Sequence, residues 1–180
     1  MYALISRERI QLPPGTVVRM PGTWQDYRAL CDSRGDGSIP RLKYRNGEIL
    51  LMSPLPKHGR EAHLVAHVVI AILDQQNRNY EAFTSITMEL PEAGGIEPDY
   101  CFYIDNWQAA VGRDRLQWGR DPAPNLVIEI DVTTYTDAND YAAYNVPEVW
   151  LNVPEVWLLQ KKSPSRHLWS RSKRLPTANR

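Results

Sequence analysis

The stretch NLVIEIDV, residues 125–132, has two acidic side chains inside an otherwise largely apolar segment that reads as a strand. Side chains alternate between the two faces of a strand, so Ile128 and Ile130 share one face while Glu129 and Asp131 share the other. A carboxylate is costly to bury unless it is paired or binds a metal. The pattern therefore indicates either a cation site on a central strand or an edge strand with one solvated face.

Two further acidic residues lie at the ends of predicted strands. Asp99 comes near the start of PDYCFYI, a strand predicted over residues 98–104, although Pro-Asp is also common in turns. Glu48 follows Asn46-Gly47, a strong signal for a type I′ turn, in a hairpin predicted over residues 41–52. Taken alone, each of these acids is more readily explained by a turn or by a solvated hairpin.

The longest predicted helix ends near residue 77, because apolar side chains recur at helical spacing on one face. That face consists of Leu64, Val65, Val68, Ala71 and Ile72. His58 stands at the start of this helix. His63 and His67 are four residues apart on it, a spacing that zinc sites use. No glutamate follows His63 in the HExxH order, so a zinc hydrolase is an alternative to two ordinary helical histidines.

The order of elements predicts the fold class. Residues 1–37 read as an irregular arm with one short helix, capped by Thr23. After the hairpin and the long helix come strands near residues 80–90, 98–104 and 125–132, with Gly94-Gly95 breaking the chain between the first two. A short helix near residues 137–144 and a strand over 146–151 follow. This order predicts an α/β or α+β fold, with a mixed β-sheet flanked by helices.

Composition narrows the class of protein. The 180 residues carry 21 basic and 21 acidic side chains, but residues 159–180 hold seven of the basic ones and none of the acidic ones. The body, residues 1–158, is therefore acidic and the end basic. Two cysteines without metal or redox spacing, and no long apolar run, predict a cytoplasmic protein without a membrane span.

The C-terminal part contains a duplication, since NVPEVWL occurs at residues 145–151 and again at 152–158. Two copies are too few for a repeat architecture. The residues beyond them have no clear apolar period, which predicts a basic, disordered tail over residues 159–180. The predicted division is thus an N-terminal arm (1–37), a core (38–158) and a tail (159–180).

Four segments in order resemble the Uma-two family of restriction endonucleases. RLKYRNGEILLMSPLPKHGR (41–60) resembles its hairpin and helix entry, and SITMELPEAGGIEPDYCFYI (85–104) its strand leading into the PD motif. NLVIEIDVT (125–133) resembles its metal-binding strand, and VPEVW (146–150) its last core strand. The match spans about residues 38–151. The resemblance implies a restriction-endonuclease-like PD-(D/E)XK core and a bacterial, often cyanobacterial, source.

The resemblance also implies an activity and a set of site residues. Asp99 and Glu129 match the two carboxylates that bind Mg²⁺ (or Mn²⁺), with the carbonyl of Ile130 as a backbone ligand. Glu48 matches the hairpin glutamate and His58 the helix-entry histidine, and both would line the catalytic cleft. The implied function is endonucleolytic hydrolysis of DNA phosphodiester bonds by a metal-activated water. A homodimer is also expected, because dimers commonly cut both strands.

One departure from the superfamily pattern opens an alternative. Asp131 stands where the superfamily has a catalytic lysine, and the following segment, TYTDANDYAAY (134–144), contains no Lys or Arg. Asn139 or Tyr141 could point inward there, but neither carries positive charge. The alternative is a catalytically inactive nuclease-fold domain that acts in DNA binding or protein interaction.

Overall fold

The structure is a computed structural model of the chain and describes residues 4–5, 10–84, 86–131, 136–153, 156–162 and 169–176. It has two compact units, residues 1–59 with 85–97 and residues 60–84 with 98–180. This division differs from the one predicted from the sequence, which placed boundaries at residues 37 and 158 and assigned each domain a single continuous segment. Strands and helices occur together in a mixed α+β architecture, as the sequence predicted.

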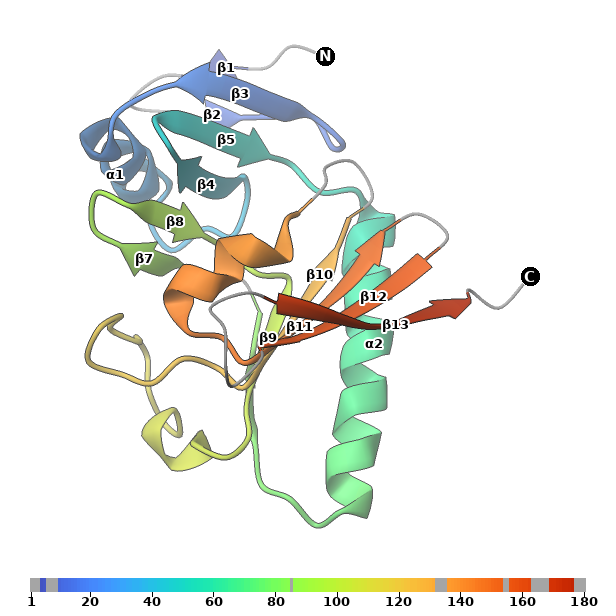
Figure 1. Ribbon diagram of the computed structural model, residues 1–180. Coiled ribbons are helices and arrows are strands. Elements are labelled where there is room, and N and C mark those ends of the chain that lie inside the picture. Colours follow the sequence, from blue (N-terminus) through green and yellow to red (C-terminus); the bar gives the residue numbers. More distant parts are fainter. Residues whose placement is uncertain are drawn as a thin grey trace. The chain divides into compact units, whose positions relative to one another are not determined.

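The first unit is built on a five-stranded sheet (Figure 1). Its order is β3 (Val17–Pro21), β5 (Glu48–Met52), β4 (Arg41–Arg45), β8 (Gly94–Ile96) and β7 (Met88–Leu90). Asn46 and Gly47, which join β4 to β5, both have positive φ, at 51° and 78°. The predicted type I′ hairpin is therefore confirmed, because that turn requires positive φ at both central residues.

The N-terminal arm contains strands that the sequence did not predict. β3 pairs with β5, and β1 (Leu4–Ile5) pairs with β2 (Ile10–Gln11). The prolines of the arm suggested irregular structure, yet Pro21 comes at the last position of β3, on the edge of the sheet. Proline is tolerated at such positions, because its missing N–H is not needed by a further strand.

The short N-terminal helix α1 (Trp24–Arg34) begins as predicted at Thr23. The Thr23 hydroxyl accepts a hydrogen bond from the backbone N–H of Asp26, and the Asp26 carboxylate accepts one from the N–H of Thr23. This reciprocal capping satisfies two backbone donors at the helix start. Tyr27 is the fully buried residue of α1, and a Cβ built on Gly95 would come within 2.3 Å of its ring. Gly95 therefore lies inside β8 to leave room for Tyr27, rather than breaking the chain as the sequence suggested.

A buried ion pair holds the first unit together. The Arg34 guanidinium donates to both carboxylate oxygens of Glu97, at 2.7 and 2.6 Å. The same carboxylate accepts hydrogen bonds from the N–H of Leu42 and the hydroxyl of Thr87, at 3.0 and 2.9 Å. Four hydrogen bonds offset the loss of hydration of this buried carboxylate, so Glu97 has a structural role.

The second unit is built on a six-stranded sheet with one parallel pair. The order is β13 (Trp169–Pro176), β12 (Val156–Lys162), β11 (Glu148–Val153), β10 (Leu126–Ile130), β9 (Tyr100–Tyr103) and β6 (Glu81–Phe83). β10 and β11 are parallel and the other pairs are antiparallel. All five residues of β10 are buried, which makes it a central strand and not the edge strand that the sequence left open.

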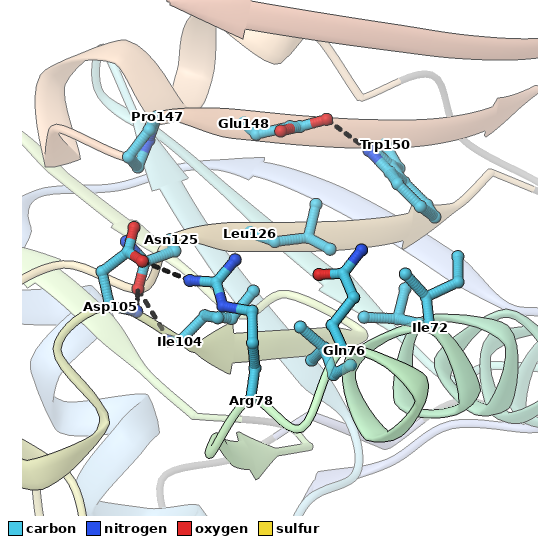
Figure 2. Close-up of a pocket in the computed structure, with 12 residues that line it drawn as sticks. Ile72, Gln76, Arg78, Ile104, Asp105, Asn125, Leu126, Pro147, Glu148 and Trp150 are labelled. Atoms are coloured by element: carbon cyan, nitrogen blue, oxygen red, sulfur yellow. Dashed lines mark hydrogen bonds and ion pairs between the residues drawn. The ribbon is translucent and has the colours of Figure 1, made fainter.

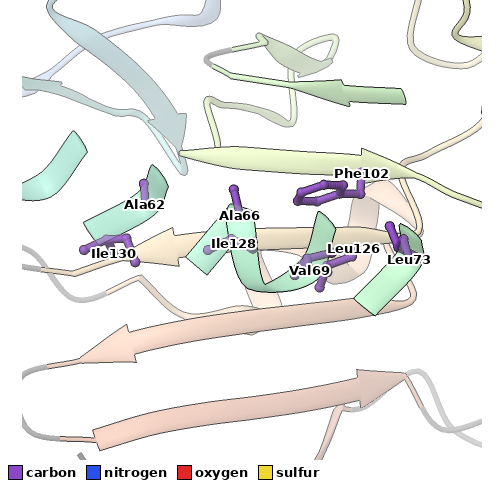
Figure 3. Close-up of a cluster of buried hydrophobic side chains, with 8 residues drawn as sticks. All are labelled: Ala62, Ala66, Val69, Leu73, Phe102, Leu126, Ile128 and Ile130. Atoms are coloured by element: carbon purple, nitrogen blue, oxygen red, sulfur yellow. The ribbon is translucent and has the colours of Figure 1, made fainter. Parts of the chain in front are cut away.

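Helix α2 (Pro56–Gln75) lies along one face of this sheet, and its residues from 60 onward belong to the second unit (Figure 1). Figure 3 shows the contact, in which small and medium side chains of α2 meet residues of β9 and β10. The buried cluster consists of Ala62, Ala66, Val69, Leu73, Phe102, Leu126, Ile128 and Ile130. Leu64, Val68 and Ile72, which the sequence placed on the apolar face, are instead exposed. The alanines allow the helix to approach the sheet closely, and this turns the larger side chains outward.

Two other predicted elements differ in detail. The single strand expected over residues 80–90 consists of β6 and β7, which belong to different sheets. The helix expected near residues 137–144 is the 3-10 helix η2 (Ala138–Tyr144), and a second 3-10 helix, η1 (Trp107–Ala109), follows β9. Where the structure describes the chain, no helix is long and apolar enough to cross a bilayer.

The C-terminal region departs from the disordered tail that the sequence predicted over residues 159–180. β12 pairs with β11 and β13 with β12, both antiparallel, in a two-hairpin extension of the sheet. The second copy of the repeated heptad supplies both the end of β11 and the start of β12, and its last residue, Leu158, pairs with Leu151 at the end of the first copy. Strand pairing through the backbone does not require an apolar period in the sequence, so these strands had no signal of the kind that predicts a half-buried strand. Residues 163–168 and 177–180 lie outside the described residues.

Candidate metal centre

Asp99 and Glu129 lie at the same end of two neighbouring strands. β9 and β10 are antiparallel, and Ile128 opposite Tyr100 is the last ladder pair. Asp99 directly precedes β9, and Glu129 is the next residue of β10, so one further step of the register makes them neighbours. Both side chains are buried, at 2% and 7% exposure. Two acidic groups are therefore held together inside the second unit.

Hydrogen bonds connect the two residues in both directions. The Asp99 carboxylate accepts from the backbone N–H of Ile130, with Oδ2 2.7 Å from the nitrogen. The Glu129 carboxylate accepts from the backbone N–H of Asp99, with Oε2 3.3 Å from the nitrogen. Each carboxylate thus reaches the backbone beside the other. The separation of the two groups is fixed by the strand pairing, not by flexible loops.

The carbonyl of Ile130 completes a set of oxygen atoms at this position. The Asp131 N–H bonds to Asn152 of β11, so the backbone polar groups of Ile130 turn toward β9. Two steps beyond the last ladder pair, the same register aligns Ile130 with Pro98, which has no N–H. Proline at this position therefore leaves the Ile130 carbonyl without the ladder donor that another residue would supply.

Tyr141 of η2 holds the Glu129 side chain. Its ring is fully buried, and its hydroxyl donates a hydrogen bond to Glu129 Oε1. Of the two inward-pointing residues considered from the sequence, Tyr141 is the one that reaches the site. Asn139 is exposed and bonds to Asp137. Sequence reasoning did not assign Tyr141 to Glu129, because a tyrosine at this spacing has no distinctive motif.

Asp131, at the nominal lysine position, has a structural partner. Its buried carboxylate accepts hydrogen bonds from the backbone N–H and from the hydroxyl of Thr136, the latter at 2.8 Å. These bonds tie the end of β10 to the segment that leads into η2. Asp131 therefore anchors the chain and does not replace a cationic side chain.

The other predicted site residues belong to the first unit. Glu48 is exposed at the start of β5 and forms an ion pair with Arg19, with 3.0 Å between Oε1 and the guanidinium nitrogen. His58 is buried in the first turn of α2, and its backbone N–H donates to the carbonyl of Leu55. The structure thus brings together Asp99, Glu129 and Ile130, and the assignments of Glu48 and His58 rest on the motif match.

His63 and His67 lie side by side on α2, with ring centroids 4.3 Å apart. Both are exposed. Catalytic zinc sites use three protein ligands. Among the residues that the structure describes, no group of three or more His, Cys, Asp or Glu side chains is arranged to hold a metal. The described residues therefore give no support to the zinc hydrolase alternative.

A cavity of about 380 Å³ opens in the second unit, at the other end of β10 (Figure 2). Its walls come from α2, β10, β11 and the residues around Asp105, including Leu73, Asn125, Leu126 and Trp150. An ion pair between Arg78 and Asp105 lies at its rim. Asp99 and Glu129 do not line this cavity, so it is separate from the candidate metal centre.

The donor set of the centre suits a hard divalent cation. Two carboxylates and one peptide carbonyl are oxygen ligands of the kind that Mg²⁺ and Mn²⁺ prefer. Both carboxylates are buried and also gain from a cation, because their own hydration is lost. The residues therefore fit the metal that the sequence resemblance implied.

Comparison with known proteins identifies first the class and then the family. Among solved structures, the chain matches a crystal structure from Anabaena variabilis described as "a putative nuclease belonging to DUF820", with a TM-score of 0.55 and 17% sequence identity over 83% of each chain. The protein therefore has a nuclease-like fold. Residues 24–176 match the Uma2 family, described as "Putative restriction endonuclease", and the chain belongs to that family. A search of curated proteins gave no significant match.

Proposed function

We propose that the protein is a Mg²⁺- or Mn²⁺-dependent endonuclease that hydrolyses phosphodiester bonds in DNA. The observation that carries the proposal is the reciprocal pairing of Asp99 and Glu129 beside the Ile130 carbonyl, within a chain of a restriction endonuclease family. The proposed ligands are these two carboxylates and that carbonyl. Glu48 and His58 are proposed to take part on the basis of the motif match alone.

When bound, the metal would lower the pKa of a coordinated water and neutralise charge on the scissile phosphate. The residues of the chain would bind the metal and hold its ligands in place. Asp99 and Glu129 supply negative charge at a fixed separation, because each is bonded to the backbone of the neighbouring strand. Tyr141 fixes the rotamer of Glu129 through its hydroxyl. Such fixed ligands limit reorganisation when the substrate arrives.

A second candidate is a catalytically inactive domain of the same fold that binds DNA or another protein. The observation in its favour is Asp131, whose carboxylate stands at the lysine position and is bonded to Thr136. Without a cation there, less charge is available to stabilise the transition state of phosphoryl transfer. The two candidates differ in one property, since both could bind a metal but only the endonuclease cleaves DNA.

Free thiols favour a reducing compartment, and we propose that the protein is cytoplasmic. Cys31 and Cys101 are both unpaired in the described structure. Disulfides are rare in cytosolic proteins and persist in secreted ones.

The test is a supercoiled-plasmid cleavage assay with Mg²⁺, Mn²⁺ or EDTA. The expected result is metal-dependent nicking by the natural protein and at least a 100-fold loss in Asp99→Asn and in Glu129→Gln. Asp74→Asn makes the same chemical change at an exposed position of α2 and should retain activity. DNA binding without cleavage in either metal would favour the inactive domain. Equal cleavage by all variants would contradict the assignment of Asp99 and Glu129.

A further inference from the structure

The outer face of α2 has an unusual composition for a helix exposed to water. Between Arg60 and Asp74, the exposed positions of the helix carry no Lys, Arg, Asp or Glu. They are His63, Leu64, His67, Val68, Ala71 and Ile72. A surface helix normally has charged and polar residues on the side opposite its buried stripe. Here the buried stripe begins with two alanines, Ala62 and Ala66, whereas the exposed face carries three larger apolar side chains beside the two histidines.

Three apolar side chains form a continuous row on this face. Leu64, Val68 and Ile72 are 54%, 56% and 42% exposed and follow one another at intervals of four residues. Residues four apart lie above one another on a helix. Exposed apolar side chains that lie next to one another form a candidate contact surface.

The two histidines lie beside this row at the same spacing. The ring centroids of His63 and His67 are 4.3 Å apart. Two nitrogen ligands of one tetrahedral zinc ion are roughly 3.4 Å apart, so both rings can reach one ion with little rotation. Structural zinc sites take four protein ligands. Because the described residues contain no third His, Cys, Asp or Glu arranged around this pair, one copy supplies half of a site.

We propose that α2 is the interface of a zinc-bridged homodimer, in which His63 and His67 of two copies form a four-histidine site flanked by the Leu64, Val68 and Ile72 rows. A twofold axis through the ion makes the two ligand pairs equivalent, as a symmetric dimer requires. The face suits contact with its own copy, because a surface without formal charge does not repel itself. This inference does not rest on the proposed nuclease function.

The metal is needed for association because the apolar row is small. Three side chains on each copy cover far less than the roughly 800 Å² per partner of a stable interface. Zinc ligation adds the missing affinity, and the apolar rows favour one orientation of the two helices. The proposal therefore predicts monomers without zinc and dimers with it.

Sedimentation velocity of the full chain, with EDTA or with added Zn²⁺, tests the proposal. The expected result is a monomer in EDTA and a dimer in Zn²⁺, with one tightly bound zinc ion per two chains by elemental analysis. The double variant His63→Gln/His67→Gln should weaken the zinc-dependent dimer at least 100-fold. His167→Gln, the same change at a position outside the described residues, serves as the control and should still form the dimer.

A second variant tests the apolar row separately. Val68→Glu places like charges on both sides of the axis and should weaken the dimer at least 10-fold in Zn²⁺. His63, His67 and Val68 are exposed, and His167 lies outside the described residues. Thermal melting checks that each variant folds. Three results would overturn the proposal: a monomer in Zn²⁺, one zinc ion per chain, or a dimer that persists in EDTA and in the double histidine variant.

Discussion

The hydrogen bond from Tyr141 to Glu129 gives a prediction that depends on the geometry of the candidate centre. Tyr141→Phe removes only the hydroxyl from a fully buried ring, so the packing of the ring is retained. Glu129 Oε1 then loses a donor in a site where the side chain is 7% exposed. Hydrogen bonds to charged groups contribute about 1.5–3 kcal/mol, and this is the expected loss in the free energy of unfolding.

Thermal melting of the metal-free protein measures this loss. For a chain of this size, the expected fall in Tm is roughly 3–12 °C. Tyr103→Phe is the matched control, because Tyr103 is also fully buried and its hydroxyl has no hydrogen-bond partner within the described structure. Removing that hydroxyl should leave Tm unchanged or raise it slightly, since a polar group without a partner is costly to bury.

The difference in Tm between the two variants tests whether the Tyr141 hydroxyl stabilises the folded protein through Glu129. A fall in Tm for Tyr141→Phe with none for Tyr103→Phe would support the assigned hydrogen bond. If both variants melt at the temperature of the natural protein, the Tyr141 hydroxyl does not stabilise Glu129. Added Mn²⁺ should raise the Tm of both proteins, because a ligand that binds only the folded state stabilises that state.

Three further predictions concern other parts of the chain. Arg34→Met leaves the buried Glu97 carboxylate without its ion pair, so urea unfolding should show a loss of about 3–5 kcal/mol; a loss under 1 kcal/mol would contradict the buried pair. Pro98→Ala supplies an N–H opposite Ile130, and calorimetry should show Mn²⁺ binding at least 10-fold weaker, whereas unchanged binding would refute the role of this carbonyl. Burial raises the pKa of Cys31 to about 11. The unfolded thiol loses its proton first, near pH 8.5, so stability should fall between pH 8.5 and 11, and this fall should be smaller in Cys31→Ser.

Features that depend on local chemistry could be predicted from the sequence. The hairpin follows from Asn46 and Gly47, which tolerate the positive φ that the turn needs. The start of α1 follows from Thr23, whose hydroxyl caps the helix. Both signals act within a few residues, so no tertiary context is needed to interpret them.

The orientation of α2 could not be predicted from the sequence. The positions of its large apolar residues indicated the wrong buried face. Ala62 and Ala66 pack against the sheet, while the larger Leu64 and Val68 are exposed. Helical periodicity is recognised mainly from large apolar residues, whereas a helix that packs closely on a sheet can bury small residues such as alanine. Which face of α2 is exposed depends on its contact with β9 and β10, which the sequence of the helix does not reveal.

The site depends on pairing between distant segments. Thirty residues separate Asp99 from Glu129, and only the register of β9 and β10 makes them neighbours. The acidic pattern of β10 indicated a cation, and the family resemblance indicated the partner strand. Tyr141 had no comparable signal, because its contact with Glu129 arises from the path of η2.

The most direct test of the central claim is the position of Mn²⁺ in an anomalous difference map from crystals soaked in the ion. We expect one ion within about 2.2 Å of a carboxylate oxygen of Asp99, a carboxylate oxygen of Glu129 and the carbonyl oxygen of Ile130. The ion should disappear in crystals of Glu129→Gln. An ion bound only elsewhere, with Asp99 and Glu129 still bonded to the backbone and no anomalous density between them, would show that these two residues do not form a metal centre.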